Sequence, residues 1–308
     1  MTTAHDRQAH HMPTAHERAP AHLRADTLSP EGRPRAALTW LRRQLLLVPE
    51  AVLLTALLGL HSLRGPSPLL ALLGLAVTVY FGARVALLAL GRQALAAAAY
   101  ERAERLAGAA ALMHPASADA QALRGALALA RGDATAAVGA FERAAALFPG
   151  QPELQASLGA ALLEDGRPQE ARAAALSALA ANRRSPAAHL HLASAEEQLG
   201  AAPEHVEALL RAGLALPARP AEEGALRCAL AALLLRQSRL AEARLALAGA
   251  EGLLVACPAP QRAGLHYYLG ELLRLGGDED GARQHYSASE SADPHGPYAA
   301  ASWRAARS

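Results

Sequence analysis

The sequence predicts an all-α protein in which a two-helix transmembrane hairpin, residues 44–90, precedes a helical solenoid of five to six repeats, residues 91–296. A period of about 34 residues, marked by glycine, alanine and proline in successive units, predicts the solenoid. Two long apolar runs, separated by a short proline-containing loop, predict the hairpin. Together they indicate a chain whose first part suits lipid and whose second part stacks similar units on one another.

The first 28 residues form a polar tail for which we expect disorder. The tail carries five of the 13 histidines, but no cysteine and no fixed helical spacing accompanies these imidazoles, so we expect no metal site. Residues 29–43 are expected to form a short amphipathic helix that leads into the hairpin, with Ser29 as its N-cap and Pro30 at its first position.

The two apolar runs are Leu45–Leu63 and Leu69–Leu90. At about 1.5 Å per residue, each is about long enough to cross a bilayer core of roughly 30 Å. A pair of buried core helices is the alternative interpretation. Several arginines flank the outer ends of the runs, whereas the loop between them has only Arg64. The positive-inside rule therefore predicts an integral protein of the bacterial plasma membrane with both termini in the cytoplasm.

Two ionisable residues lie within these runs, Glu50 in the first and Arg84 in the second. Both lie a short way in from the cytoplasmic end of their run, so the two side chains are expected at a similar depth. A charge at that depth costs at least a few kcal/mol unless it finds a partner or reaches the interface. We therefore expect either a Glu50–Arg84 pair, with Pro49 bending the first helix beside it, or two side chains that extend separately to the inner interface.

The period is clearest at Gly91, Gly125 and Gly159, each of which is followed by an alanine at the same spacing. Small side chains allow two helices to cross closely, and a terminal proline ends the second helix of a unit. Glycine-containing turns separate the two helices, so each unit is predicted to be a helical hairpin. No proline interrupts the chain from Leu69 to about Ala98, so the second apolar helix is expected to continue into the first unit.

The second halves of three units, residues 100–115, 132–149 and 277–294, resemble the second helix of a tetratricopeptide repeat. The resemblance covers roughly residues 84 to 296. It departs from the family pattern at His205, which replaces the packing alanine, and where Arg183 and Val255 stand in place of the terminal proline. The resemblance implies a helical solenoid whose concave face, formed mainly by the first helix of each unit, binds a protein or peptide.

Placing the repeat on this sequence assigns small apolar residues such as Ala122, Ala126 and Leu129 to the concave face, with Cys228 further along. Polar residues appear on that face toward the C-terminus. The residues expected to contact a partner are Leu190, Ser194, Glu197, Tyr267, Glu271 and Arg274. The alternative is that each of them packs against neighbouring helices.

The sequence contains no motif of a hydrolase, a nucleotide-binding loop or a zinc protease, so we expect neither an enzyme nor a cofactor. From Gly91 onward there are 21 arginines and 23 acidic residues, a difference of −2, which excludes a basic surface for nucleic acid. Cys228 and Cys257 lack metal-type spacing and are expected to be reduced, packed thiols.

The favoured function is a membrane-anchored scaffold whose cytosolic repeats bind a protein or peptide partner, in contact with the lipid bilayer. The alternative resembles assembly factors of the cytochrome c maturation kind, whose repeats hold an unfolded client outside the cytoplasm. A third possibility is a structural cap on a larger membrane complex. Residues 297–308 are expected to form a capping helix that packs through Tyr298 and Trp303. The oligomeric state does not follow from the sequence.

Overall fold

The computed structural model describes residues 49–65, 67–148 and 150–307, and every regular element in these ranges is a helix. The predicted tail, the amphipathic helix of residues 29–43 and the first residues of the hairpin lie outside the described residues. The helices are α2 (Pro49–Arg64), α3 (Pro68–Ala96), α4 (Tyr100–Met113), α5 (Ala118–Ala130), α6 (Ala134–Leu147), α7 (Pro152–Glu164), α8 (Pro168–Ala181), α9 (Pro186–Gln198), α10 (Pro203–Leu214), α11 (Pro220–Arg236), α12 (Leu240–Ala246), α13 (Ala250–Leu254), α14 (Ala259–Leu275), α15 (Glu279–Ala292) and α16 (Ala299–Arg307).

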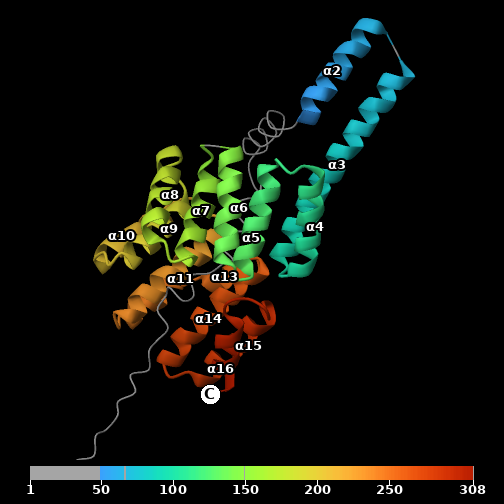
Figure 1. The fold of residues 1–308 in the computed structure, drawn as a ribbon. Coiled ribbons are helices and arrows are strands. Elements are labelled where there is room, and N and C mark those ends of the chain that lie inside the picture. The colour runs from blue at the N-terminus through green and yellow to red at the C-terminus, as the bar shows by residue number, and fades with distance from the viewer. Residues whose placement is uncertain (1–48, 66, 149, 308) are drawn as a thin grey trace, which may run out of the picture.

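The helices from α3 to α15 follow one another in packed pairs, which confirms the predicted solenoid (Figure 1). The first helices of four pairs end at a glycine with positive φ, as predicted from the turns; these are Gly132, Gly166, Gly200 and Gly277. Glycine adopts this left-handed conformation without a steric penalty and so ends a helix readily.

Close helix crossings explain the periodic glycines. A methyl group added at Gly125 would lie 2.8 Å from Phe141, and one added at Gly270 would lie 2.8 Å from Tyr286. At Gly159 the nearest atom would be the Ala171 carbonyl oxygen at 3.4 Å. At this repeat position, a methyl group would therefore clash in the units of Gly125 and Gly270 but would make an ordinary van der Waals contact in the unit of Gly159.

Two repeat units differ from the pattern at the places where the sequence departs from it. His205 is exposed, and the neighbouring Val206 is the buried residue at the start of α10. In the next unit the second helix is divided into α12 and α13 at Gly249, whose φ is +80°. Val255, which stands where a terminal proline was expected, is exposed just after α13.

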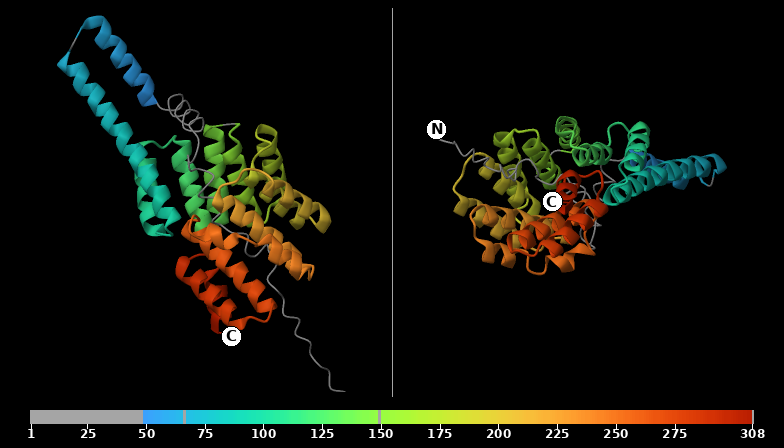
Figure 2. Two further views of the ribbon diagram at one scale, coloured as in Figure 1. Left: turned by 180° about the vertical axis from the view of Figure 1, so that it is seen from behind. Right: turned by 90° about the horizontal axis from the view of Figure 1, so that it is seen from below.

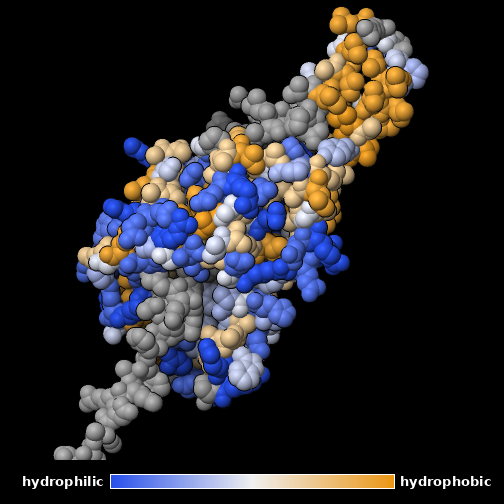
Figure 3. All heavy atoms as spheres, in the orientation of Figure 1, coloured by the Kyte–Doolittle hydropathy of each residue, from blue (hydrophilic) through white to orange (hydrophobic). Residues whose placement is uncertain are grey.

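Helices α2 and α3 form a hairpin that projects from the body of the solenoid, and we call it the apolar hairpin (Figure 1). Its surface is covered with leucine, valine and other apolar side chains (Figure 3). Of the helices described, α3 alone is long and apolar enough to cross a membrane, and the apolar part of α2, Leu53–Leu63, is shorter. As predicted, α3 continues without a break into the first repeat, where Leu88, Gly91 and Leu95 are buried.

The two ends of the solenoid meet. The Tyr100 hydroxyl at the start of α4 donates a hydrogen bond of 2.7 Å to Asp293 Oδ2 after α15, and both residues are buried. Figure 2 shows this arrangement from behind and from below, with α14–α16 turned back toward the first repeats. Helix α16 packs on α15, and Tyr298, directly before α16, is buried. The prediction for Trp303 was wrong: its side chain is 49% exposed, and the Arg307 guanidinium from the same helix lies 4.6 Å from the centre of its ring.

Candidate interaction surface

The apolar residues predicted to line the concave face are mostly buried. Leu190 is 3% and Tyr267 is 8% exposed, and Cys228, Ala122 and Ala126 are also buried. Tyr267 belongs to an aromatic cluster with Tyr268, Tyr286 and Tyr298, whose rings come from α14, α15 and the start of the C-terminal segment. These side chains therefore offer little free surface, and their role in partner binding stays a prediction.

The polar residues predicted for the same face are paired within the solenoid. Glu197 forms an ion pair with Arg236 of α11, and Ser194 is half-buried. Glu271 accepts hydrogen bonds of 2.9 Å from Arg274 and from the Tyr286 hydroxyl. The hydrogen bond to Glu271 raises the pKa of the Arg274 guanidinium. The contacts of Glu197 with Arg236 and of Glu271 with Tyr286 join different helices, and contact with a partner stays a prediction for these residues too.

In the apolar hairpin, Arg84 is 2% exposed and its guanidinium carbon lies 5.7 Å from the centre of the Phe81 ring. The Arg84 Nε is buried and has no hydrogen-bond partner among the described residues. The side chain of Glu50 lies outside the described residues, so the predicted Glu50–Arg84 pair stays a prediction. Pro49 is the first residue of α2 as described, so the predicted bend at Pro49 also stays a prediction.

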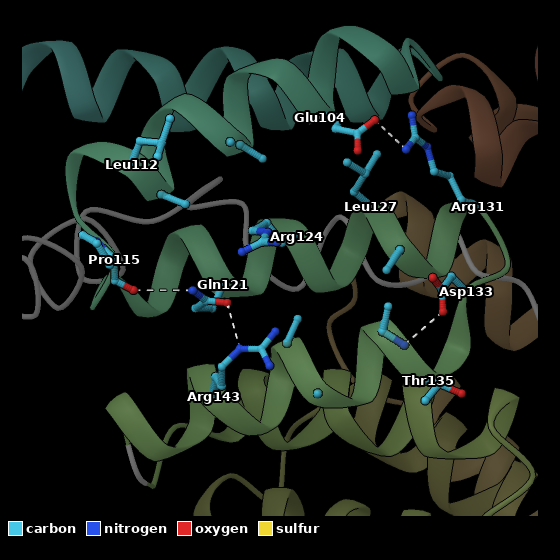
Figure 4. A pocket seen from close by; sticks show the side chains of 17 residues that line it. Glu104, Leu112, Pro115, Gln121, Arg124, Leu127, Arg131, Asp133, Thr135 and Arg143 are labelled. Atoms are coloured by element: carbon cyan, nitrogen blue, oxygen red, sulfur yellow. Dashed lines mark hydrogen bonds and ion pairs between the residues drawn. The ribbon is translucent and has the colours of Figure 1, made fainter.

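A pocket of about 830 Å³ opens between α4, α5 and α6, and we call it the α4–α6 pocket (Figure 4). Small residues line much of its wall: Ala107, Gly108 and Ala111 from α4 face Ala136, Gly139 and Ala140 from α6. The remaining lining residues are Glu104, Leu112, Pro115, Gln121, Arg124, Leu127, Ala128, Arg131, Asp133, Thr135 and Arg143. The small side chains at these six positions leave open the space between α4 and α6.

The α4–α6 pocket lies on the opposite side of α5 from the predicted groove. Successive residues of a helix are rotated by about 100°, so Arg124 and Arg131 lie roughly 180° from Ala122 and Ala126 around the axis of α5. The repeat pattern in the sequence does not predict this pocket. Gly108 and Gly139 were the available signal, because both lie inside a second helix and outside the positions that define the repeat period.

Most charges around the α4–α6 pocket are already engaged. Arg131 pairs with Glu104 at 2.6 Å, and Asp133 caps α6 by accepting a 3.0 Å hydrogen bond from the Ala136 amide. The Arg143 Nε donates to Gln121 Oε1 at 3.2 Å, which leaves its terminal nitrogens available. Arg124 is exposed and makes no hydrogen bond or ion pair within the described part of the chain. The pocket therefore presents two guanidinium groups beside an apolar wall.

A second cluster joins α14 and α15, where the Nδ1 atoms of His266 and His285 are 3.0 Å apart. Burial, followed by the effects of His285 and Arg262, lowers the pKa of His266 to about 4, and burial also lowers the pKa of His285 despite nearby Glu251. Two protonated rings cannot share this contact, so at least one ring is neutral. No group of three or more potential metal ligands occurs in the ranges that the structure describes.

The two cysteines are buried and not joined by a disulfide, in agreement with the prediction of packed thiols. Burial, with a smaller effect of Cys257, raises the pKa of Cys228. Because the thiolate is the reactive form, neither residue is suited to nucleophilic chemistry as folded.

Comparison with known proteins identifies the repeats. Two family models, both described as tetratricopeptide repeat, match residues 128–195 in one case and residues 85–152 and 228–297 in the other, together more than half of the sequence. The crystal structure of a thermophilic tetratricopeptide repeat protein from Thermus thermophilus is 25% identical, with a TM-score of 0.53 over 62% of this chain and 99% of that chain. A tetratricopeptide repeat protein from Parabacteroides merdae is 16% identical, with a TM-score of 0.55 over 83% of this chain and 91% of that chain. A search of curated proteins found no match.

Proposed function

Because the chain belongs to the tetratricopeptide repeat family, we propose that it is a membrane-anchored scaffold whose repeats hold a protein partner beside the bilayer. Proteins of this family mediate protein–protein interactions, and no catalytic family is indicated. The proposal assigns anchoring to the apolar hairpin and partner binding to the solenoid.

The observation that carries the anchoring is the exposed apolar surface of α2 and α3. Leu63, Leu69 and Leu72 are all largely exposed on it, and soluble monomers rarely expose contiguous apolar patches larger than a few hundred Å². The apolar part of α3, residues 69–90, is about 33 Å long at about 1.5 Å per residue, close to a bilayer core of roughly 30 Å, although Arg84 and Leu88 near its end are buried within the structure. The described part of α2, 16 residues, is shorter, so its share of the crossing depends on residues before Pro49.

The unbroken α3 also supports the scaffold role. Its last turns are part of the first repeat, so the orientation of the solenoid relative to the membrane would be set by one continuous helix. The arginine distribution favours repeats in the cytoplasm of a bacterial cell.

Cysteine labelling in intact bacterial cells tests both the anchoring and the orientation. Two single-cysteine proteins, Ser67→Cys in the hairpin loop and Ser287→Cys on the exposed side of α15, are made in a background where Cys228 and Cys257 are serine. In intact cells, a membrane-impermeant maleimide is expected to label Ser67→Cys but not Ser287→Cys. After lysis, it is expected to label Ser287→Cys as well. Labelling of the second protein alone would place the repeats outside and favour the cytochrome c maturation alternative. Recovery of the chain in the soluble fraction after alkaline washing would refute the anchor.

The interior of the hairpin provides a separate prediction, that Glu50 and Arg84 pair. The Glu50→Gln, Arg84→Gln double variant is then expected to insert better than the sum of the single-variant defects predicts, because each single change leaves one charge without its partner. Membrane insertion measured by glycosylation mapping or protease protection gives the three values. Additive defects would support separate extension of the two side chains to the interface.

A further inference from the structure

We infer that the α4–α6 pocket, on the side of the solenoid opposite the predicted groove, binds an acidic peptide segment of the partner protein. The inference rests on the proposed scaffold function and adds a second binding face to it. The pocket volume of about 830 Å³ falls within the range of roughly 300–1,000 Å³ that is usual for ligand pockets.

The walls suit the close approach of a peptide. Gly108 and Gly139 lie on opposite sides of the pocket and leave the backbone there without a side chain. A methyl group added at Gly108 would meet no atom within 4 Å, and one added at Gly139 would meet only Arg143. At the edge of the pocket Leu112 is 85% exposed, so an apolar side chain of a bound peptide could cover it.

The charges select an acidic peptide over a basic or neutral one. The pocket lining carries three arginines and two carboxylates, a net charge of +1, with Glu104 paired to Arg131 and Asp133 bound to the Ala136 amide at the start of α6. Arg124 and the terminal nitrogens of Arg143 remain to bind an anion. A planar guanidinium binds a carboxylate through two parallel hydrogen bonds, which gives direction as well as charge.

The position of the pocket suits a segment close to the membrane. The Tyr80 hydroxyl of α3 donates a hydrogen bond to the carbonyl oxygen of Met113, which follows Leu112 at the end of α4. One end of the pocket is thereby tied to the middle of α3, within the apolar run of residues 69–90. A partner that spans the same membrane would present a segment next to its own span at this height.

The test is a selection of random 12-residue peptides displayed on phage, performed on the full chain in lipid nanodiscs. Peptides enriched on the unchanged protein are expected to carry an excess of Asp and Glu together with at least one large apolar residue. Synthetic versions are then measured by fluorescence anisotropy at two salt concentrations, and higher salt is expected to weaken binding.

Two variants make the site assignment specific. Gly108→Leu places a bulky side chain in the pocket at a position where an added Cβ meets no atom within 4 Å, and leucine is a better helix former than glycine, so the fold is expected to be retained. Gly252→Leu is its matched control, because Gly252 is also a helical glycine with no atom within 4 Å of an added methyl group, but in α13. Gly108→Leu is expected to weaken peptide binding at least about tenfold and Gly252→Leu to leave it unchanged. In the charge-reversal variant Arg124→Glu, acidic peptides are expected to lose affinity by a similar factor and selection to shift toward basic peptides.

Equal binding to the Gly108→Leu variant would overturn the inference, as would a selection that yields no pocket-dependent peptide. Competition by a 12-nucleotide RNA but not by acidic peptides would assign the guanidinium groups to nucleic acid instead. These outcomes leave the scaffold proposal intact, because that proposal is decided by the labelling of Ser67→Cys and Ser287→Cys and by partner binding elsewhere on the solenoid.

Discussion

Replacing Gly125 by alanine is expected to destabilise the second repeat, whereas the same change at Gly159 is expected to stabilise the third. The two glycines occupy the same position in successive repeats, one in α5 and the other in α7. The difference between them is the neighbour that the new methyl group would meet. At Gly125 three ring atoms of Phe141 would lie at 2.8–2.9 Å, whereas at Gly159 the nearest atom would be 3.4 Å away.

The magnitudes follow from two opposing effects. Alanine is more favourable than glycine in a helix by about 0.8–1 kcal/mol, and this gain applies at both positions. Overpacking of a filled core costs about 1–3 kcal/mol, and it applies only at Gly125, because Phe141 is fully buried and cannot move into solvent. The variants are therefore expected to differ by about 1–3 kcal/mol, with Gly159→Ala about 1 kcal/mol more stable than the unchanged protein.

Native-state hydrogen exchange is the suitable assay, because a solenoid opens locally and its repeats differ in stability. Amides of α5 and α6 report on Gly125→Ala, and amides of α7 and α8 report on Gly159→Ala. The substitution Phe141→Leu adds a control: it is expected to cost less in the Gly125→Ala background than alone, because it relieves the contact. Equal effects of the two alanine substitutions, or no coupling with Phe141→Leu, would refute the reasoning.

Two further predictions concern contacts between distant or adjacent repeats. Tyr100→Phe removes the hydroxyl that donates a hydrogen bond to a buried oxygen of Asp293, so it is expected to lower the free energy of unfolding by about 1–3 kcal/mol. Hydrogen exchange is then expected to become faster in both α4 and α15. Faster exchange in α4 alone would contradict contact between the two ends of the solenoid. Burial and the neighbouring His285 lower the pKa of His266 to about 4, below its ordinary value of 6.5, so the unfolded state binds more protons between these values. The stability of the α14–α15 pair is therefore expected to fall as the pH falls from about 6.5 to 4, as measured by hydrogen exchange corrected for intrinsic rates. A His266→Phe variant with an unchanged pH dependence would assign the effect to other groups.

The helical pairing could be predicted because local signals agree with the repeat. Gly132 and Gly277 each end a helix with a positive φ, and they can do so because glycine has no Cβ to clash in that conformation. This signal depends on the glycine itself and not on distant residues. The turn between α11 and α12 gives no such signal, because Ser238 adopts the left-handed conformation there with a φ of +60°. The division of the following helix at Gly249 is also hidden, since a glycine inside a helical pattern is compatible with either outcome.

The candidate surfaces were harder to predict because exposure depends on residues far away in the sequence. Tyr267 belongs to the concave face by its repeat position, but Tyr298 from the C-terminal segment packs against it and buries it. The α4–α6 pocket depends on the absence of bulk on the second helices of two successive repeats, and in a chain this rich in alanine such an absence is not conspicuous. A repeat pattern therefore identifies the faces of the helices but not which face remains open.

The arrangement of the two faces bears on how a scaffold of this kind could work. The apolar residues predicted for the concave face are buried, its charged residues are paired, and the ends of the solenoid are joined by the Tyr100–Asp293 hydrogen bond, so a partner entering there would have to displace contacts that stabilise the solenoid. The α4–α6 pocket requires no such displacement, and because α3 forms part of the same repeat, a segment bound there would be held at a fixed position relative to the apolar hairpin. Binding at the pocket is thus compatible with a rigid solenoid, whereas binding in the groove requires it to open, and hydrogen exchange across Tyr100 and Asp293 in the presence of a partner distinguishes the two.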